Sequence, residues 1–333
     1  MLISDFGGED AVIKLIESLH IGGDDRVVVG FGDDAAVLRT GTNRLLIVTT
    51  DLLIEGTHFR RDIIDAYSLG WKAVAVNISD IAAMGGKPTW GFVSIALPNI
   101  EVSFVEELYR GMNDISNRYG SKIIGGDTNR VAGNIVVNVA QLGEVEDGRY
   151  ALRSTAKPGQ RVLVTGFIGE SLAGFKLLDR LGFEQASREH PEVVQRHIRP
   201  IPRVAEARAA TENNLVRAMM DLSDGLAIDL GKMCKASSVG ARIYTEKLPV
   251  SGALKQAAEA LGENAAVLAA SGGEDYELLI AANPEDAERL ADIVHQATGT
   301  MVTEIGEFTE GSETVIVSLD GEEKPLEPGW IHF

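Results

Sequence analysis

The chain has 333 residues, of which 45% are hydrophobic, so it is long enough for about two globular domains. Its formal net charge of −18 and its pI near 4.8 argue against a nucleic acid or an anionic membrane as the partner, because either would require a basic face. The single cysteine, Cys234, excludes a disulfide framework and a cysteine-based zinc site. The first residues lack a basic-then-apolar leader and no run of about 20 apolar residues occurs, so we expect a cytoplasmic protein.

The first half of the chain predicts a mixed α/β arrangement. Residues 11–19 carry apolar side chains at helical spacing and predict a surface helix. Further on, apolar runs predict strands at 27–29, 45–49, 91–97, 122–124 and 135–142, and longer periodic segments predict helices at 65–84 and 102–118.

A second α/β half follows a boundary near residue 146. The acidic, glycine-containing stretch 144–148 and the turn Lys157-Pro158-Gly159 precede a new strand at 161–165. We therefore divide the chain into domains 1–146 and 147–333. In the second half, helices are expected at 170–181, 203–213, 225–236, 251–261 and 284–297, and strands at 215–220, 239–244, 275–281, 302–307 and 314–318.

The most informative pattern is a set of short acidic motifs beside glycines or inside apolar runs. An isolated ionised aspartate in such surroundings would cost several kcal/mol to desolvate unless something cationic paired with it. Carboxylates and hydroxyls are hard oxygen ligands suited to Mg²⁺, so the pattern predicts a metal site. The motifs are Asp33-Asp34 in GFGDDAA, Asp51 in TTDLLIEGTHF, Asp80 in AVNISDIAAMGG, Asp127 in GGDTNR, and Asp221 and Asp224 in MMDLSDGL.

Three of these motifs also have ordinary structural interpretations. GFGDDAA is typical of a hairpin turn, in which one aspartate could bind metal while the other holds the loop. The segment 49–51 is expected at the carboxyl end of a strand, where α/β proteins place ligand groups, and His58 follows in a polar loop. GGDTNR is expected as a turn after strand 122–124, either a plain turn or a phosphate cradle.

Asp80 and Asp221 are harder to explain structurally. Asp80 lies in a helix that is apolar on most sides and therefore buried, so a cation, an N–H donor or Asn77 must compensate its charge. Asp221 ends an apolar strand, and Ser223 or Asp224 is expected to cap the following helix. Capping does not explain Asp221, and a helix N-terminus also favours an anion.

Two further segments carry candidate ligand residues. In SGGEDYELLI, Glu274 and Asp275 are expected at the start of a strand, which can also be an ordinary charged strand entry. The C-terminal GWIHF is expected either to cover the core or to offer Trp330 as a stacking platform for a ligand ring.

Missing motifs narrow the chemistry. The chain has no P-loop, no protein-kinase HRD and DFG elements, no HExxH and no GxSxG. The remaining possibility is a site in which protein carboxylates hold a divalent metal and the metal binds a phosphate-rich ligand. Phosphoryl transfer from ATP is the leading reaction class for such a site. Two rival interpretations are ATP-driven activation of an amide or selenide, and a catalytically silent metal- or nucleotide-binding scaffold.

Taken in order, the acidic motifs together with LRSTAKPGQ, SGGEDYELL and the terminal GW resemble the thiamine-monophosphate kinase family, in the superfamily of aminoimidazole ribonucleotide synthetase. The resemblance runs nearly from end to end. It implies a two-domain, synthetase-like α/β (α+β) fold, in which the N-terminal mixed sheet pairs across a homodimer to form a shared β-barrel and a C-terminal α/β domain completes the site. The implied activity is transfer of the γ-phosphoryl group of ATP to thiamine monophosphate, giving thiamine diphosphate and ADP.

The resemblance also implies residue roles. Several Mg²⁺ ions would be held by Asp33, Thr49, Thr50, Asp51, Asp80, Asp127, Asp221 and Asp224. ATP would contact Tyr109, Gly126, Asp127, Arg153 and Ser223, and thiamine monophosphate would contact His58, Glu274 and Trp330. An acceptor phosphate is already ionised near neutral pH, so no general base is assigned. Asn129 and the Gly86-Lys87 pair depart from the expected family pattern without touching a proposed metal ligand.

Overall fold

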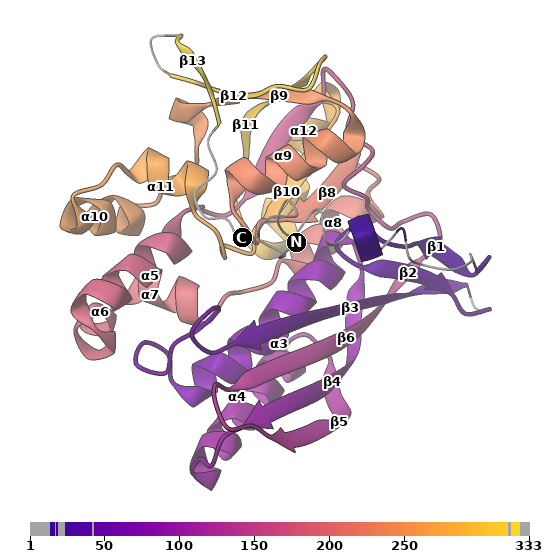
Figure 1. The fold of residues 1–333 in the computed structure, drawn as a ribbon. Coiled ribbons are helices and arrows are strands. Elements are labelled where there is room, and N and C mark those ends of the chain that lie inside the picture. Colours follow the sequence, from indigo (N-terminus) through magenta and orange to yellow (C-terminus); the bar gives the residue numbers. More distant parts are fainter. Residues whose placement is uncertain (1–13, 17, 19–23, 42, 319–320, 327–333) are drawn as a thin grey trace.

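The computed structural model describes residues 14–16, 18, 24–41, 43–318 and 321–326, and these form two β-sheets with helices between and around them (Figure 1). The first sheet and its helices come from the first half of the chain, and the second sheet from the second half. Helix α3 (Ala66–Ala83) belongs to the first half but also contacts strand β8 and helix α8 of the second. It therefore forms much of the junction between the halves.

In the described part of the chain, the first sheet has six strands in the order β1-β2-β3-β6-β4-β5. All neighbours are antiparallel except β4 and β5, which are parallel. The sheet is therefore mixed, as predicted. The strands are β1 (Val27–Val29), β2 (Ala36–Arg39), β3 (Arg44–Ile54), β4 (Lys87–Leu97), β5 (Lys122–Arg130) and β6 (Val136–Glu146).

Side-chain alternation gives this sheet one buried and one open face. Along β3, Leu45, Ile47 and Leu53 point to the buried face, which α3 covers together with α4 (Val102–Arg118). The two helices approach each other unusually closely: a Cβ on Gly70 would collide with the backbone of Leu108, and one on Gly111 with that of Tyr67. Glycine at these positions lets α3 pack directly on α4.

The second sheet has seven strands among the described residues, in the order β13-β12-β9-β11-β7-β10-β8. Its neighbours are antiparallel apart from β12 and β9. The inner strands are almost wholly buried because helices lie on both faces. The strands are β7 (Arg161–Thr165), β8 (Ala218–Asp221), β9 (Gly240–Tyr244), β10 (Leu278–Ala282), β11 (Val302–Thr309), β12 (Thr314–Val317) and β13 (Glu323–Pro325).

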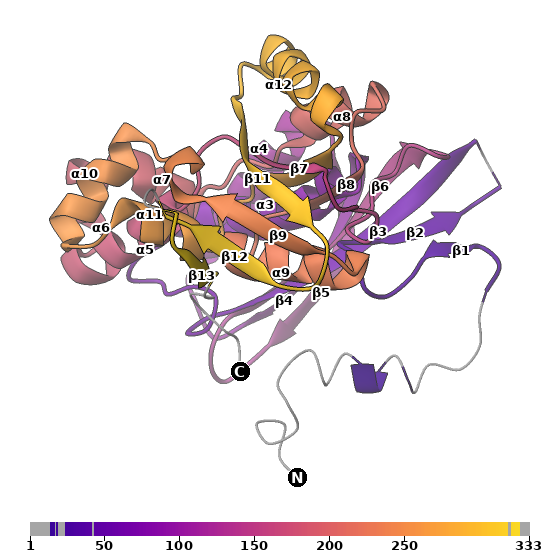
Figure 2. The same ribbon diagram turned by 90° about the horizontal axis from the view of Figure 1, so that it is seen from above.

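Helices of the second half divide into two groups. Seen from above, α8 (Val204–Glu212) and α12 (Pro284–Thr298) lie on one face of the second sheet and α9 (Leu226–Ser237) on the other (Figure 2). The remaining helices form a separate cluster beside the sheet (Figure 1). They are α5 (Glu170–Leu181), α6 (Phe183–Glu189), α7 (Pro191–Ile198), α10 (Gly252–Leu261) and α11 (Ala265–Ser271). No helix in the described ranges combines the length and apolarity that crossing a bilayer requires.

Most predicted elements are present, but four local predictions are wrong. GGDTNR is not a turn, because β5 continues through it to Arg130 in parallel pairing with β4. Residues 49–51 lie within β3 and not at its end. Neither Ser223 nor Asp224 caps α9, whose N-cap position is Gly225. The strand expected at 275–281 begins only at Leu278.

Other elements were not anticipated, or fall outside the description. The sequence did not predict β2, α6, α7, α11 or β13. Most of the helix expected at 11–19 lies outside the described residues, and so does Trp330.

The close packing of α3 on α4 predicts that Gly111→Ala lowers the free energy of unfolding by about 1–3 kcal/mol, because the added methyl forces the helices apart. Gly231→Ala is the matched control, since Gly231 lies inside α9 and a Cβ there meets nothing within 4 Å. It should raise stability by about 0.5–1 kcal/mol. Urea unfolding of both variants measures the contrast, and equal effects would contradict the packing argument.

Candidate functional site

Three carboxylates from distant parts of the chain meet where the two halves join. Asp34, Asp80 and Asp221 each offer an oxygen atom, and these atoms lie within 4.8 Å of one another. Asp34 precedes β2, Asp80 lies in the last turn of α3, and Asp221 ends β8. We call these three residues the acidic cluster.

Like charges and burial make the acidic cluster electrostatically costly. Burial is the main cause that raises the pKa of Asp80 well above its usual range, and repulsion from Asp51, Asp221 and Asp34 adds to it. Burial likewise raises the pKa of Asp34 well above the ordinary value, although Arg153 opposes this. The pKa of Asp221 is also raised by burial, against a hydrogen bond from Ser79. The protein therefore does not supply enough positive charge to stabilise all three carboxylates in their ionised form.

Strand β3 sorts the three residues 49–51 between the two faces of the sheet. Thr49 points inward, and its Oγ1 donates a hydrogen bond of 2.6 Å to Asp80 Oδ2. Asp51 also points inward, and burial followed by repulsion from Asp221 and Asp224 raises its pKa to about 6. Thr50 is exposed on the opposite face, where its Oγ1 accepts a hydrogen bond from Asn138. Alternation along one strand thus brings Thr49 and Asp51 toward the acidic cluster and turns Thr50 away.

Of the two adjacent aspartates, Asp34 is the one that enters the acidic cluster. Arg153 lies against both: its Nε is 3.6 Å from Asp33 Oδ1, and its Nη2 contacts Asp34. Its backbone N–H also donates to the Asp33 carboxylate at 3.3 Å. Asp34 was not among the predicted ligands, because sequence alone does not say which of two adjacent aspartates faces inward.

Helix α3 supplies further contacts that the sequence did not assign. Ser79 Oγ donates to Asp221 Oδ2 at 2.6 Å, tying α3 to the end of β8. Asn77 was one of three groups expected to compensate Asp80, beside a cation or an N–H donor, but its Oδ1 accepts from the Asp51 backbone N–H at 3.0 Å and its Nδ2 donates to Ala73 O. The side chain that donates to Asp80 is that of Thr49.

Asp229, to which the sequence analysis assigned no role, holds the loop after Asp221 in place. Its Oδ2 accepts hydrogen bonds from the backbone N–H groups of Asp224 and Gly225, each 2.9 Å long. Lys232 pairs with both Asp224 and Asp229. Asp229 therefore shapes the start of α9, and Lys232 lies beside the Asp224 carboxylate that was proposed as a metal ligand.

The loop that carries Glu274 lies next to the loop that follows Asp221. The Glu274 N–H donates to Ser223 O at 2.7 Å, and the Tyr276 N–H donates to Leu222 O at 2.9 Å. Two side chains contact the Glu274 carboxylate: Lys72 Nζ lies 2.8 Å from Oε1, and His197 Nδ1 lies 3.3 Å from Oε2. His58 is close enough to contribute to lowering the pKa of Glu274. Two proposed substrate residues, His58 and Glu274, thus share one region beside the acidic cluster.

Three proposed nucleotide residues lie apart from the acidic cluster. Gly126 is in the same cross-strand row as Asp51, with Val139 and Val93 between them, so about 14 Å separates the two backbones. Asp127 follows on the edge strand β5 and accepts hydrogen bonds from the Thr128 N–H and from Asn129 Nδ2. The prediction that Asn129 does not touch a proposed metal ligand is therefore wrong. Tyr109 lies on α4, half-buried, and burial raises its pKa. The contacts of these residues with ATP remain proposals.

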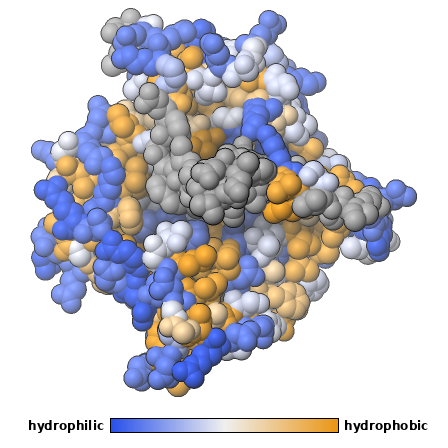
Figure 3. Space-filling view, in the orientation of Figure 1, coloured by the Kyte–Doolittle hydropathy of each residue, from blue (hydrophilic) through white to orange (hydrophobic). Residues whose placement is uncertain are grey.

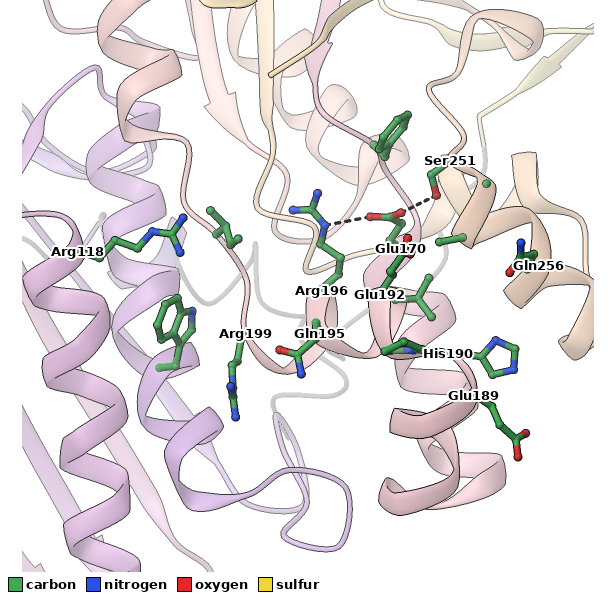
Figure 4. Close-up of a pocket in the computed structure, with 17 residues that line it drawn as sticks. Arg118, Glu170, Glu189, His190, Glu192, Gln195, Arg196, Arg199, Ser251 and Gln256 are labelled. Atoms are coloured by element: carbon green, nitrogen blue, oxygen red, sulfur yellow. Dashed lines mark hydrogen bonds and ion pairs between the residues drawn. The ribbon is translucent and has the colours of Figure 1, made fainter. Parts of the chain in front are cut away.

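A separate pocket of about 810 Å³ lies between α3 and α4 on one side and α5, α7 and α10 on the other. Figure 4 shows Glu170 in its wall, bridging Arg196 and Ser251, while Arg118 and Arg199 line the side nearer α3. Its lining residues include none of the acidic cluster. The pocket is therefore distinct from the junction where the carboxylates meet.

The acidic cluster has the donor set of a divalent cation site. All three members offer hard oxygen atoms, and Thr49 and Asp51 stand beside them. Asp34 Oδ2 is buried and has no hydrogen-bond partner among the described residues. A buried carboxylate oxygen without a donor is costly, and a bound cation would remove that cost. The residues present fit Mg²⁺.

Asp80→Asn should stabilise the metal-free protein, because the substitution removes one of several buried like charges and Asn can still accept from Thr49. We expect a gain of about 0.5–2 kcal/mol in the free energy of unfolding in EDTA. In the wild type, added Mg²⁺ should raise the melting temperature by mass action, and the variant should lose most of that response.

Asp147→Asn is the matched control, since Asp147 forms a half-exposed ion pair with Arg39 far from the acidic cluster. It should change stability by less than about 0.5 kcal/mol and leave the Mg²⁺ response intact. If Asp80→Asn instead lowered the free energy of unfolding in EDTA, this would contradict the argument that like charges repel one another in the metal-free acidic cluster.

Comparisons with known proteins agree with this arrangement. Residues 32–145 match the family model described as AIR synthase related protein, N-terminal domain, and residues 157–318 match its C-terminal domain. The chain is 39% identical over 308 residues to the thiamine-monophosphate kinase of Escherichia coli strain K12, covering 92% of each chain. It is 36% identical over 333 residues to the thiamine-monophosphate kinase of Aquifex aeolicus strain VF5, covering 99% of this chain and 98% of the relative.

A solved structure gives the same result in three dimensions. The structure of AaThiL complexed with AMPPCP and TMP superposes with a TM-score of 0.86 at 35% identity, covering all of this chain and 99% of the other. The predicted two-domain, synthetase-like α/β fold is confirmed by this match. Identity above 35% to full-length relatives, both domain matches and the shared fold lead to one conclusion: the chain belongs to the thiamine-monophosphate kinase family.

Proposed function

We propose that this protein transfers the γ-phosphoryl group of ATP to thiamine monophosphate and releases thiamine diphosphate and ADP. The observation that carries the proposal is the acidic cluster at the junction of the two halves, in a chain whose relatives are thiamine-monophosphate kinases. The solved relative bound to AMPPCP and TMP supports a site that takes a nucleotide and a second phosphate ligand together. Domain 1–146 supplies most of the proposed metal and nucleotide residues, and domain 147–333 completes the site.

In this proposal, Asp34, Asp80 and Asp221 hold magnesium, with Thr49, Asp51 and Asp33 next to them. Bound Mg²⁺ neutralises phosphate charge that an acidic protein would otherwise repel. The remaining proposed ligands, Thr50, Asp127 and Asp224, would act from outside the acidic cluster. Several ions are needed, because two substrates bring more phosphate charge than one ion offsets.

Arg153 is the cation of the protein best placed to meet a phosphate. Its guanidinium lies beside Asp33 and Asp34, and Asp221 also contributes to raising its pKa, so it is always charged. Ser223 lies in the loop that leads from Asp221 to α9. We propose that these two residues orient the phosphates of ATP, and that Tyr109, Gly126 and Asp127 contact the nucleotide further along the sheet.

Glu274 and His58 are proposed to bind thiamine monophosphate, together with Trp330. The thiazolium ring is a permanent cation and the pyrimidine carries an amino group, so an ionised carboxylate suits both. No side chain is assigned as a general base. The acceptor phosphate is already ionised near neutral pH, and positioning together with charge neutralisation supplies most of the rate.

The kinase proposal predicts that purified protein forms thiamine diphosphate and ADP in equal amounts, and only when ATP, Mg²⁺ and thiamine monophosphate are all present. Chromatographic separation of the thiamine species measures this directly. Asp221→Asn should lower kcat by about 100-fold or more, because it removes charge that holds magnesium, whereas Asp147→Asn should not. Failure of the wild type to form thiamine diphosphate would exclude the kinase proposal.

We also propose that the protein is a homodimer built on the open face of the first sheet. This face, opposite α3 and α4, exposes four large apolar side chains: Leu52 at 47%, Trp90 at 43%, Phe92 at 40% and Ile124 at 55%. Figure 3 shows apolar residues gathered where Figure 1 draws β3, β6 and β4. An apolar face of this kind favours a protein partner, and a second copy packed against it would form the barrel that the family resemblance implies.

Phe92→Lys should break the dimer, because it places a charge in the centre of the apolar face. Sedimentation should show the wild type at twice the 35.7 kDa chain mass and the variant as a single chain. Met301→Lys is the control, since Met301 is also an exposed apolar residue, at 57%, but immediately precedes β11 of the second sheet. A wild type that sediments as a single chain would overturn the dimer proposal.

A further inference from the structure

We propose that Lys72 and His197 are positioning residues that hold the Glu274 carboxylate ionised and oriented for thiamine monophosphate. The inference rests on the proposed function, since it assigns Glu274 to that substrate, and it adds two residues that do not themselves contact the substrate. Each comes from a different helix, so Glu274 is held between the two halves of the chain.

Lys72 is the first of these residues. It lies on α3, and its side chain is only 1% exposed, which is unusual for a lysine. Its Nζ is 2.8 Å from Glu274 Oε1. An ammonium group is removed from water at a cost of several kcal/mol unless a carboxylate pairs with it, so this contact fixes where the Glu274 side chain lies.

His197 contacts the other oxygen of the carboxylate. Burial lowers the pKa of His197 to about 3, and Lys72 adds to the effect, so the ring is neutral at physiological pH. Its Nδ1 is 3.3 Å from Glu274 Oε2 and 3.1 Å from Ser171 Oγ. The two oxygens of Glu274 thus lie against different partners, Lys72 on one side and His197 on the other.

The helix that carries His197 is itself fixed in place. The preceding residue, Arg196, donates to Glu170 at 3.0 Å, and Glu170 accepts a further hydrogen bond of 2.5 Å from Ser251 (Figure 4). These contacts join α7 to α5 and to the start of α10. The position of the imidazole is therefore set by three helices.

The backbone around Glu274 shows strain that suits a functional role. Glu274 has a φ of 63° and Tyr276 a φ of 51°, values that side-chain-bearing residues rarely adopt. The loop is held in this form by its hydrogen bonds to Ser223 and Leu222, next to the acidic cluster. The same strands and loops therefore fix the distance between the proposed metal site and the proposed substrate carboxylate.

The charges around Glu274 favour its ionised form. Burial alone would raise the pKa of Glu274, but Lys72 and His197, and then His58, outweigh it, so the pKa is lowered. Tyr276 also faces this carboxylate, and its pKa is raised mainly by burial and then by Glu274. Among the groups that lower the pKa of Glu274, Lys72 has the largest effect. Without it, burial would favour a protonated Glu274.

Lys72→Met tests the inference. We expect the KM for thiamine monophosphate to rise by about tenfold and the KM for ATP to change by less than about twofold. The acidic fall in kcat/KM for thiamine monophosphate should move to higher pH by about one unit or more, because Glu274 then takes up a proton more readily. Glu274→Gln should remove this acidic fall in kcat/KM, both in the wild type and in the Lys72→Met variant. If Lys72→Met is too unstable to purify, Lys72→Gln takes its place, because glutamine keeps hydrogen-bond donors but has no charge. We expect the same changes in KM and in the pH profile for this variant.

Lys176→Met is the matched control, because Lys176 forms a half-exposed pair with Glu263 at 2.7 Å away from this region. It should leave both KM values and the pH profile unchanged. A purely structural Lys72 would lower the melting temperature but leave the KM for thiamine monophosphate and the acidic limb as in the wild type, and that result would overturn the inference.

A second readout separates this inference from the proposed function. If the wild type forms no thiamine diphosphate, the kinase proposal fails, and Lys72 is judged by stability alone. The loss of unfolding free energy in Lys72→Met should then shrink from about pH 8 to about pH 5, because protonation of Glu274 removes an uncompensated, partly buried charge. The same loss should be independent of pH in the Glu274→Gln background. A pH-independent loss in both backgrounds would overturn the inference.

Discussion

Repulsion among buried carboxylates is the constraint on which the rest of this site depends. Asp34, Asp80 and Asp221 are brought within 4.8 Å by a loop, a helix and a strand that are far apart in the sequence. Such an arrangement opposes folding unless other contacts hold it, so the surrounding structure has to supply the stability that the acidic cluster removes. The dense packing of α3 on α4 and the buried strands of the second sheet provide it.

Helix α3 links the parts of the site because its polar residues each serve a different element. Ser79 donates to Asp221 on β8, Asn77 accepts from the Asp51 backbone on β3, and Asp80 joins the acidic cluster directly. Two turns earlier, Lys72 pairs with Glu274 from the second half. A single rigid helix can hold metal ligands and a substrate carboxylate at a fixed spacing with less loss of precision than separate loops would allow.

The sequence predicted most strands and helices, the burial of Asp221 and the buried surroundings of Asp80 on α3, because these follow from local apolar patterns. It failed where long-range pairing decides. The glycines of GGDTNR favour a turn locally, yet parallel pairing with β4 keeps them extended. Asp34 was not distinguished from Asp33, since that choice depends on which side chain faces inward. Lys72 and His197 gave no signal, because their shared partner Glu274 lies far away in sequence.

The distribution of charge explains how so acidic a chain can bind phosphates. Its cations near the site are few and already committed: Arg153 lies against Asp33 and Asp34, Lys232 against Asp224 and Asp229, and Lys72 against Glu274. Each of these cations already lies against at least one protein carboxylate and helps to hold it in place. In the proposed function, magnesium therefore carries most of the neutralisation of phosphate charge. In the proposed function, specificity for the phosphates would come through magnesium, and specificity for the thiamine ring would come through Glu274, whose ionised form the buried Lys72 favours.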